Sequence, residues 1–172
     1  MKKITLFFAL VAMFAQAKAQ FIKAELEVSG LTCSMCSLST QKSLNTLDFI
    51  GQIKPDLNKN IFYITFKADK AVSLDALKQK VKAAGFSVSK LIAIYDFKTT
   101  QDNASFQYNG DTYQFAALPN KPLTGETRLQ VLDKDFVPTS TFKKLGAQIK
   151  DASYATGGTN DKKQRVYHIS LS

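Results

Sequence analysis

The sequence contains only two cysteines and one histidine among its 172 residues, and it has no tryptophan. Two cysteines do not make the disulfide framework of a small secreted domain. A bridge between Cys33 and Cys36 would close a very short loop, so its chain-entropy contribution to stability would be small. We therefore expect these two sulfurs to have a chemical role rather than a structural one.

Dense runs of lysine or arginine are also missing, although the formal net charge is +9. Aromatic residues do not interleave with basic ones, so nucleic-acid binding has little support. We find no paired carboxylates, no Ser-His-Asp set and no Gly-rich phosphate loop that would indicate hydrolase or nucleotide chemistry. The sequence therefore does not predict an enzyme of either class.

Only one apolar run is long, and it lies at the N-terminus. Lys2 and Lys3 precede the apolar residues 4–15, and Ala17-Lys18-Ala19 has the form of an A-x-A cleavage site. The run is shorter than the ~20 residues that span a bilayer. We expect residues 1–19 to be a secretory signal peptide, whose loss lowers the formal charge to +6 and leaves no membrane span. The mature protein would be periplasmic in a Gram-negative bacterium and secreted otherwise.

The first segment after this signal alternates strictly between apolar and charged residues. Ile22, Ala24, Leu26 and Val28 share one face, and the charged side chains between them share the other. That period predicts a half-buried strand over residues 21–28.

Five more elements are predicted before residue 95. A helix over residues 34–47 should turn Leu38, Gln41, Leu44 and Leu47 to one stripe, with the leucines facing the core. Strands are expected at 49–57 and 61–66, a helix at 74–84 with Leu74, Leu77 and Val81 inward, and a last strand at 86–94. Pro55 places the second strand at an edge or a bend. The order βαββαβ is the ferredoxin-like arrangement.

Both cysteines lie between the first strand and the first helix, in Gly30-Leu31-Thr32-Cys33-Ser34-Met35-Cys36. This loop resembles the metal loop of the heavy-metal-associated (HMA) domain family. The usual signature of that family is G-M-T-C-x-x-C, and the loop differs from it only at Leu31. The element order agrees, and Ala84-Gly85-Phe86 resembles that family's G-[YF] before the last strand. The resemblance covers less than half of the mature chain. It implies an HMA-like metal-binding domain over residues 20–95, with Cys33 and Cys36 as the metal ligands.

Residues 96–172 contain no cysteine and no motif that we recognise. Asn109-Gly110-Asp111 predicts a hairpin between strands at 105–108 and 112–118. Further strands are expected at 127–132 and 165–171, with a short helix at 139–145 and a loop at 154–163. These elements suggest a small, mainly antiparallel β domain, an OB-like barrel or a sandwich, whose role is unknown. The whole chain is thus predicted to be α+β. His168 should face solvent or the second face of that barrel, with a structural role.

The position of the cysteines favours metal chemistry. The N-terminus of a helix favours thiolate over thiol, and thiolates are soft ligands for Cu(I) and Zn(II). A closed zinc site needs four ligands, whereas two sulfurs suit Cu(I), which accepts two-coordinate geometry. We therefore favour Cu(I), with Zn(II) or another soft metal as alternatives. Cys33 should be the more exposed sulfur and Cys36 the more sheltered.

Three functions remain open from the sequence. The first is an exported metal-binding protein for transfer, sequestration or sensing, with a metal donor or acceptor of acidic surface as its partner, since residues 20–95 carry a net +4. The second is a thiol–disulfide oxidoreductase. It is disfavoured because Pro55 is the only proline before residue 119 and no proline loop faces the cysteines. The third is a degenerate module with oxidised cysteines that serves protein–protein interaction. The lysines at 78, 80 and 82 are most simply a solvated face.

Overall fold

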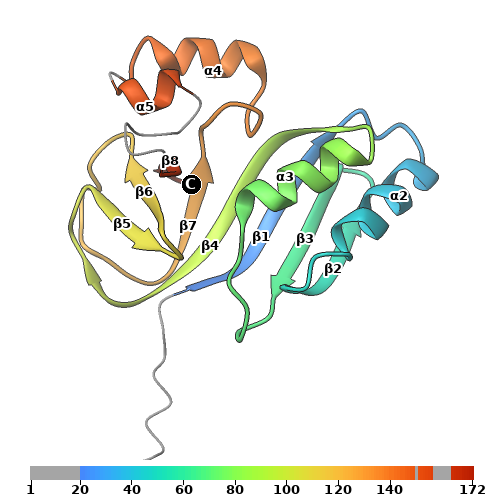
Figure 1. The fold of residues 1–172 in the computed structure, drawn as a ribbon, viewed down its shortest axis with the longest axis horizontal. Coiled ribbons are helices and arrows are strands. Elements are labelled where there is room, and N and C mark those ends of the chain that lie inside the picture. Colours follow the sequence, from blue (N-terminus) through green and yellow to red (C-terminus); the bar gives the residue numbers. More distant parts are fainter. Residues whose placement is uncertain (1–19, 150, 157–163) are drawn as a thin grey trace, which may run out of the picture.

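A computed structural model describes residues 20–149, 151–156 and 164–172, and the expected signal peptide lies outside them. One eight-stranded sheet runs through the described chain in the order β2-β3-β1-β4-β7-β8-β6-β5 (Figure 1). The strands are β1 (Gln20–Ser29), β2 (Ile50–Asp56), β3 (Ile61–Phe66), β4 (Ser87–Gln101), β5 (Ser105–Tyr108), β6 (Asp111–Phe115), β7 (Leu123–Val131) and β8 (Val166–Leu171). The helices are α2 (Ser34–Leu44), α3 (Leu74–Ala83), α4 (Thr139–Gly146) and α5 (Ala152–Ala155). The chain is α+β, as predicted.

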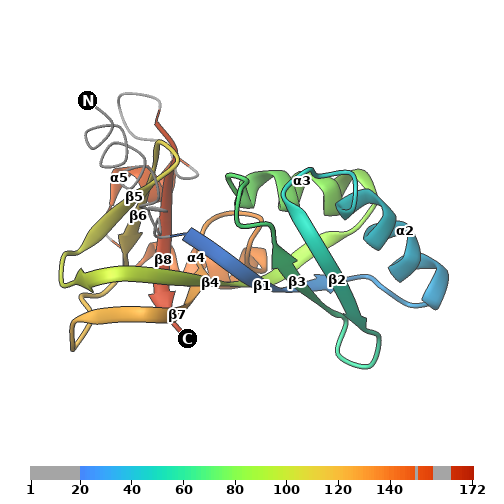
Figure 2. The same cartoon turned by 90° about the horizontal axis from the view of Figure 1, so that it is seen from below.

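The N-terminal half has the predicted ferredoxin-like order β1-α2-β2-β3-α3-β4. β1 lies between β3 and β4 and is antiparallel to both. Figure 2 shows α2 and α3 on the same side of these strands. Leu74, Leu77 and Val81 of α3 are fully buried against the sheet, as their spacing predicts. β2 is the edge strand, which explains why it tolerates Pro55.

The buried face of α2 differs from the prediction. Leu38 is 41 % exposed, whereas Ser37, Thr40 and Leu44 are buried. Leu44 is buried and Leu47 packs partly buried against the core, as predicted. The difference is therefore confined to the first half of the helix, where Ser37 and Thr40 lie inward in place of Leu38. The buried hydroxyl of Thr40 donates a hydrogen bond to the carbonyl oxygen of Cys36, 3.0 Å away, and is therefore satisfied.

The start of β1 also departs from simple alternation. The pairing of β1 with β4 shifts register between Phe21 and Lys23. This irregularity turns Phe21 into the core, where it is 1 % exposed, and leaves Ile22 only half-buried. Ala24, Leu26 and Val28 keep their predicted inward positions.

β4 joins the two halves of the molecule. It pairs with β1 through residues 87–96 and with β7 through residues 92–101. The boundary expected after residue 95 therefore falls inside one strand. The buried hydrophobic core is likewise continuous from Leu26 and Leu77 to Tyr113 and Ile169. Whether residues 20–95 fold without the remainder stays a prediction.

We expected a separate barrel or sandwich for residues 96–172. In the structure, the strands of this part instead continue the single sheet and form its curved end (Figure 2). We call β5 to β8 with α4 and α5 the C-terminal lobe. Asn109 and Gly110 have positive φ values of 51° and 86°, as the predicted hairpin turn between β5 and β6 requires. β6 pairs in parallel with β8, and the other strand pairs are antiparallel. α5 was not predicted, and part of the expected loop at 154–163 lies outside the described residues.

Polar contacts fasten the C-terminal lobe to α3 and the segment before it. Nε of Arg165 donates to Asp75 at 2.7 Å, and the backbone N–H of Asp75 donates to the hydroxyl of Tyr167 at 3.2 Å. The backbone N–H of Val72 donates to the hydroxyl of Tyr108 at 3.0 Å. Together with the β4–β7 pairing, these contacts fix the lobe relative to the N-terminal half.

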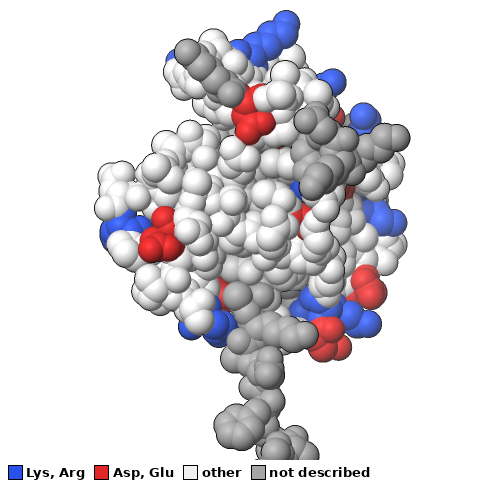
Figure 3. Space-filling view, turned by 60° about the vertical axis from the view of Figure 1, so that its left-hand side comes forward, with Lys and Arg blue, Asp and Glu red and all other residues white. Residues whose placement is uncertain are grey.

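Two general surface features follow. No helix within the described ranges is long and apolar enough to cross a membrane. On the visible part of the face shown in Figure 3, lysine and arginine side chains are scattered near acidic ones, so they form no continuous basic patch there.

Candidate metal centre

The loop after β1 owes its shape to Gly30. Its φ of +90° is a left-handed conformation that residues with side chains rarely adopt. A Cβ atom at this position would also lie 3.4 Å from the ring of Phe86. Gly30 therefore lets the chain turn sharply from the strand into α2 while packing against the segment between α3 and β4.

Cys33 is the N-cap residue of α2. Its extended backbone precedes the helix, and its Sγ accepts a hydrogen bond from the backbone N–H of Cys36 at 3.3 Å. A side-chain acceptor at this position forms a hydrogen bond with one of the free N–H groups in the first turn of a helix. The N-cap residue that provides this acceptor is usually Ser, Thr, Asp or Asn. The thiol of Cys33 is thus held at the positive end of the helix.

The two sulfurs meet at the surface. Sγ of Cys33 lies 2.8 Å from Sγ of Cys36, and both cysteines are free. This separation exceeds the bonded distance of about 2.05 Å in a disulfide. Cys33 is exposed and Cys36 is half-buried, so the predicted order of exposure is confirmed. One ion approaching from solvent can contact both sulfurs.

The pKa of the Cys33 thiol is lowered from its ordinary value of 9.0. The main cause is the hydrogen bond with the Cys36 side chain, followed by backbone N–H groups of Cys36 and Met35. Each of these contacts favours the thiolate, which is both the metal ligand and the nucleophile.

The surroundings of the sulfurs are neutral. A shallow depression of about 210 Å³ adjoins Cys33 and is lined by Leu31, Thr32, Ser34, Ser37, Leu57 and Asn60. Met35 lies in the first turn of α2, and its side chain is 69 % exposed. Phe86 is partly buried and packs against the core beside Gly30. Within the part of the chain that the structure describes, no three His, Cys, Asp or Glu side chains come together as a metal site.

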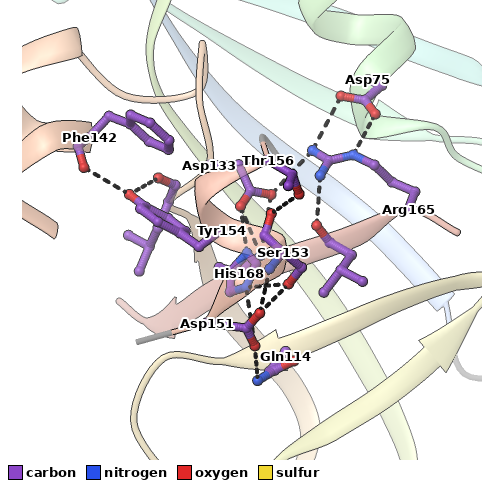
Figure 4. A network of polar contacts seen from close by, with 12 residues as sticks. Asp75, Gln114, Asp133, Phe142, Asp151, Ser153, Tyr154, Thr156, Arg165 and His168 are labelled. Carbon is purple, nitrogen blue, oxygen red and sulfur yellow. Dashed lines mark hydrogen bonds and ion pairs between the residues drawn. The ribbon is translucent and has the colours of Figure 1, made fainter. Parts of the chain in front are cut away.

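His168 lies in the C-terminal lobe on β8 and is fully buried, not exposed to solvent (Figure 4). Its Nδ1 lies 2.8 Å from Oδ1 of Asp133, and its Nε2 lies 3.2 Å from Oγ of Ser153. The prediction of a structural role agrees with these contacts. The prediction of solvent exposure fails because α5 brings Ser153 over this face of β8.

Asp133, His168 and Ser153 have the order of a Ser-His-Asp relay, which the sequence did not reveal because they come from three separate segments. The arrangement is structural, since Oγ of Ser153 is also 2.6 Å from Oδ1 of Asp151 and Ser153 is only 8 % exposed. A hydrolytic serine needs an accessible hydroxyl and donors for an oxyanion. The hydroxyl of Ser153 is instead buried and hydrogen-bonded within the network.

Comparison with known proteins identifies residues 25–87 as a heavy-metal-associated domain. The mercuric transport protein periplasmic component of Pseudomonas fluorescens is 28 % identical over 89 residues, which cover 52 % of this chain and 97 % of that protein. The resemblance of the cysteine loop to this family is therefore confirmed.

Several solved structures resemble a part of the chain. The oxidized MerP of Ralstonia metallidurans CH34 is 24 % identical, with 42 % of this chain and 96 % of that chain covered and a TM-score of 0.37. The CopZ metallochaperone is 21 % identical, with 38 % and 97 % covered and a TM-score of 0.36. A copper binding domain from HMA7, a P-type ATPase, is 25 % identical, with 40 % and 90 % covered and a TM-score of 0.37.

Proposed function

We propose that this protein is an exported carrier that binds a soft heavy-metal ion between Cys33 and Cys36 and passes it to a partner protein. The observation that carries this proposal is the pair of free thiols, 2.8 Å apart, at the exposed N-terminus of α2. They stand in a segment identified as a heavy-metal-associated domain. The lowered pKa of Cys33 supports ligation, because metal competes with fewer protons at neutral pH.

Cu(I) is the ion that best fits two thiolates without a third ligand. A tetrahedral Zn(II) site needs two further donors, and the described residues around the loop offer no carboxylate or imidazole. Hg(II) is the second candidate, because it is also soft and the curated relative is a mercuric transport protein. A direct competition between the two ions decides between them.

Transfer requires a site that a partner can reach. Cys33 is exposed, and Met35 and Leu57 beside it are 69 % and 53 % exposed. An incoming thiolate can therefore attack the ion from the Cys33 side while Cys36 still holds it. The net positive charge of residues 20–95 favours an acidic partner, with an association rate that falls with salt.

A disulfide oxidoreductase would use the same pair of cysteines. The depression beside Cys33 contains no proline among its lining residues, and Pro55 lies on the edge strand β2. This difference favours a carrier over an oxidoreductase.

The deciding experiment is an anaerobic Cu(I) titration of the reduced protein against a competing chelator, with Hg(II) as a second arm. We expect one ion per chain, and loss of tight binding in Cys33→Ser and in Cys36→Ser. Met35→Leu is the matched control, since it alters the same loop without removing a thiolate and keeps a similar volume. Unchanged affinity in either serine variant would remove this site from consideration.

A further inference from the structure

A second cavity lies where α3 and the start of β4 meet the segment between β7 and α4. It has a volume of about 380 Å³, and its lining includes Lys78, Lys82, Phe86, Val88, Asp135 and Val137. Pockets for small molecules commonly begin at about 300 Å³ and are largely preformed. We call this cavity the interlobe groove, because the N-terminal half and the C-terminal lobe each supply one wall.

The groove contains one positively and one negatively charged side chain that form no ion pair with other described residues. Lys82 on α3 and Asp135 after β7 are both exposed, and neither has a charged partner among the residues that the structure describes. The two side chains come from different walls and do not form an ion pair with each other. Lys78, in contrast, is already bound to Asp75 at 2.9 Å and lies over the ring of Phe136.

Of the other lining residues, Phe86, Val88, Val137 and Pro138 are apolar, and Ser29, Ser87, Ser89 and Thr139 carry hydroxyl groups. Val88 and Val137 are 6 % and 4 % exposed, and the ring of Phe86 is half-buried beside them. An apolar group placed against these side chains would be removed from water. Apolar burial gains about 25 cal/mol for each Å², so the groove favours a ligand that carries such a group.

The two walls cannot move apart easily. β4 and β7 are paired directly, and Arg165 joins the C-terminal lobe to Asp75 on the same helix that carries Lys82 (Figure 4). A groove that is fixed before the ligand arrives spends little free energy on ordering. The walls that carry Lys82 and Asp135 are therefore held in place before a ligand binds.

We propose that the interlobe groove binds a free α-amino acid with an apolar side chain. Its carboxylate pairs with Lys82, its ammonium group pairs with Asp135, and its side chain packs against Phe86 and Val137. A simple anion would be repelled by Asp135, and a simple cation by Lys82 and Lys78, so a zwitterion is the class that matches both charges. This binding does not depend on the metal-carrier function, because no groove side chain is a proposed metal ligand.

The test uses L-phenylalanine as the probe, with N-acetyl-L-phenylalanine and L-phenylalaninamide as analogues that each lack one charge. Binding is followed by the backbone amide signals of Ser87, Val137 and Thr139 in NMR spectra of the full protein. We expect millimolar L-phenylalanine to shift these signals. Loss of one exposed ion pair weakens binding by up to about fivefold, so each analogue should bind more weakly by that order.

Two substitutions, one for each charged side chain, test which group of the ligand each side chain binds. In Lys82→Gln, L-phenylalanine should bind no better than L-phenylalaninamide, because the carboxylate has lost its partner. In Asp135→Asn, L-phenylalanine should bind no better than N-acetyl-L-phenylalanine. Lys80→Gln is the control, since it removes an equal charge from α3 outside the groove lining.

The proposal is overturned if L-phenylalanine leaves the groove signals unchanged at millimolar concentration. It is also overturned if both variants keep the selectivity of the unaltered protein, or if Lys80→Gln loses affinity as strongly as Lys82→Gln. The variant with Cys33→Ser and Cys36→Ser should bind L-phenylalanine normally. That result separates the groove from the metal centre, whether or not the metal centre is functional.

Discussion

Arg165, which precedes β8, donates a hydrogen bond to Asp75 at the first turn of α3, ninety residues earlier in the chain, at 2.7 Å. The same guanidinium lies 3.2 Å from the buried carboxylate of Asp133, which also holds His168 (Figure 4). Arg165 thus neutralises two acidic groups from different parts of the fold. It links the helix beside the interlobe groove to the buried polar network of the C-terminal lobe.

Replacing Arg165 should therefore be costly. Arg165→Ala leaves the carboxylate of Asp133, which is 1 % exposed, without its cationic neighbour. We expect a loss of about 2–4 kcal/mol in the free energy of unfolding. The measurement is urea denaturation of both proteins under equal conditions.

Arg128→Ala is the matched control. Arg128 also binds a carboxylate through two hydrogen bonds, to Glu25, but its side chain is 44 % exposed. Water can replace such contacts, so the loss should stay below about 1 kcal/mol. Equal losses in the two variants would contradict the special role of Arg165.

Asp75 should make stability depend on pH. Burial alone raises its pKa, but the hydrogen bond and charge of Arg165 and then those of Lys78 outweigh burial, and the pKa ends below its ordinary value of 3.8. A carboxyl group with a lowered folded pKa stabilises the protein above its unfolded pKa. That contribution is lost as the pH falls from about 4 through the folded value.

The check compares the unaltered protein with Asp75→Asn at pH 7 and at pH 3. The unaltered protein should be the more stable at pH 7. The difference should shrink at pH 3, because the unfolded chain takes up a proton at Asp75 once the pH falls below the ordinary pKa of 3.8. A difference that stays constant between the two pH values would show that Asp75 contributes through its shape alone.

Cys33 should react as a thiolate at unusually low pH. Its pKa is lowered chiefly by the Cys36 side chain and then by backbone N–H groups. Alkylation of Cys33 by iodoacetamide at pH 7 should therefore be faster in the folded protein than in the urea-unfolded chain, with the rates read by mass spectrometry of the peptide that contains Cys33.

Substitutions of Cys36 test whether its side chain lowers the pKa of Cys33. Cys36→Ala removes the side-chain donor and should slow the alkylation of Cys33, whereas Cys36→Ser retains a hydroxyl donor and should slow it less. If both variants react like the unaltered protein, the helix N-terminus and not Cys36 controls the thiolate.

The features that could be predicted from the sequence are those that local patterns determine. The alternation of Ala24, Leu26 and Val28 predicts β1, and the Cys33–Cys36 spacing after Gly30 predicts the exposed loop. The hairpin turn at Asn109-Gly110 needs only the conformational freedom of these two residues. Each of these features depends on neighbours within a few positions.

The features that were missed depend on distant parts of the chain. Leu38 is exposed while Ser37 and Thr40 are buried, although hydrophobicity alone would favour the leucine for the buried face. The length of β4 depends on β7, whose pairing partner no local pattern specifies. His168 is buried because Asp133 and Ser153, which belong to other segments of the chain, pack against it. The interlobe groove exists only where two such segments meet.

Residues 20–95 should fold cooperatively without the rest of the chain, since they retain the pairings of β1 with β3 and β4 and of β2 with β3. Their stability should be lower than that of the full protein. Ending the chain at Tyr95 removes β7 from the edge of β4 and exposes Phe21, whose ring contacts Tyr108 and Tyr113 of the C-terminal lobe. We expect a single urea transition at lower denaturant concentration, followed by far-UV circular dichroism. A gradual, non-cooperative transition would show that β7 is part of the folding unit, and that the boundary after residue 95 is not a domain boundary.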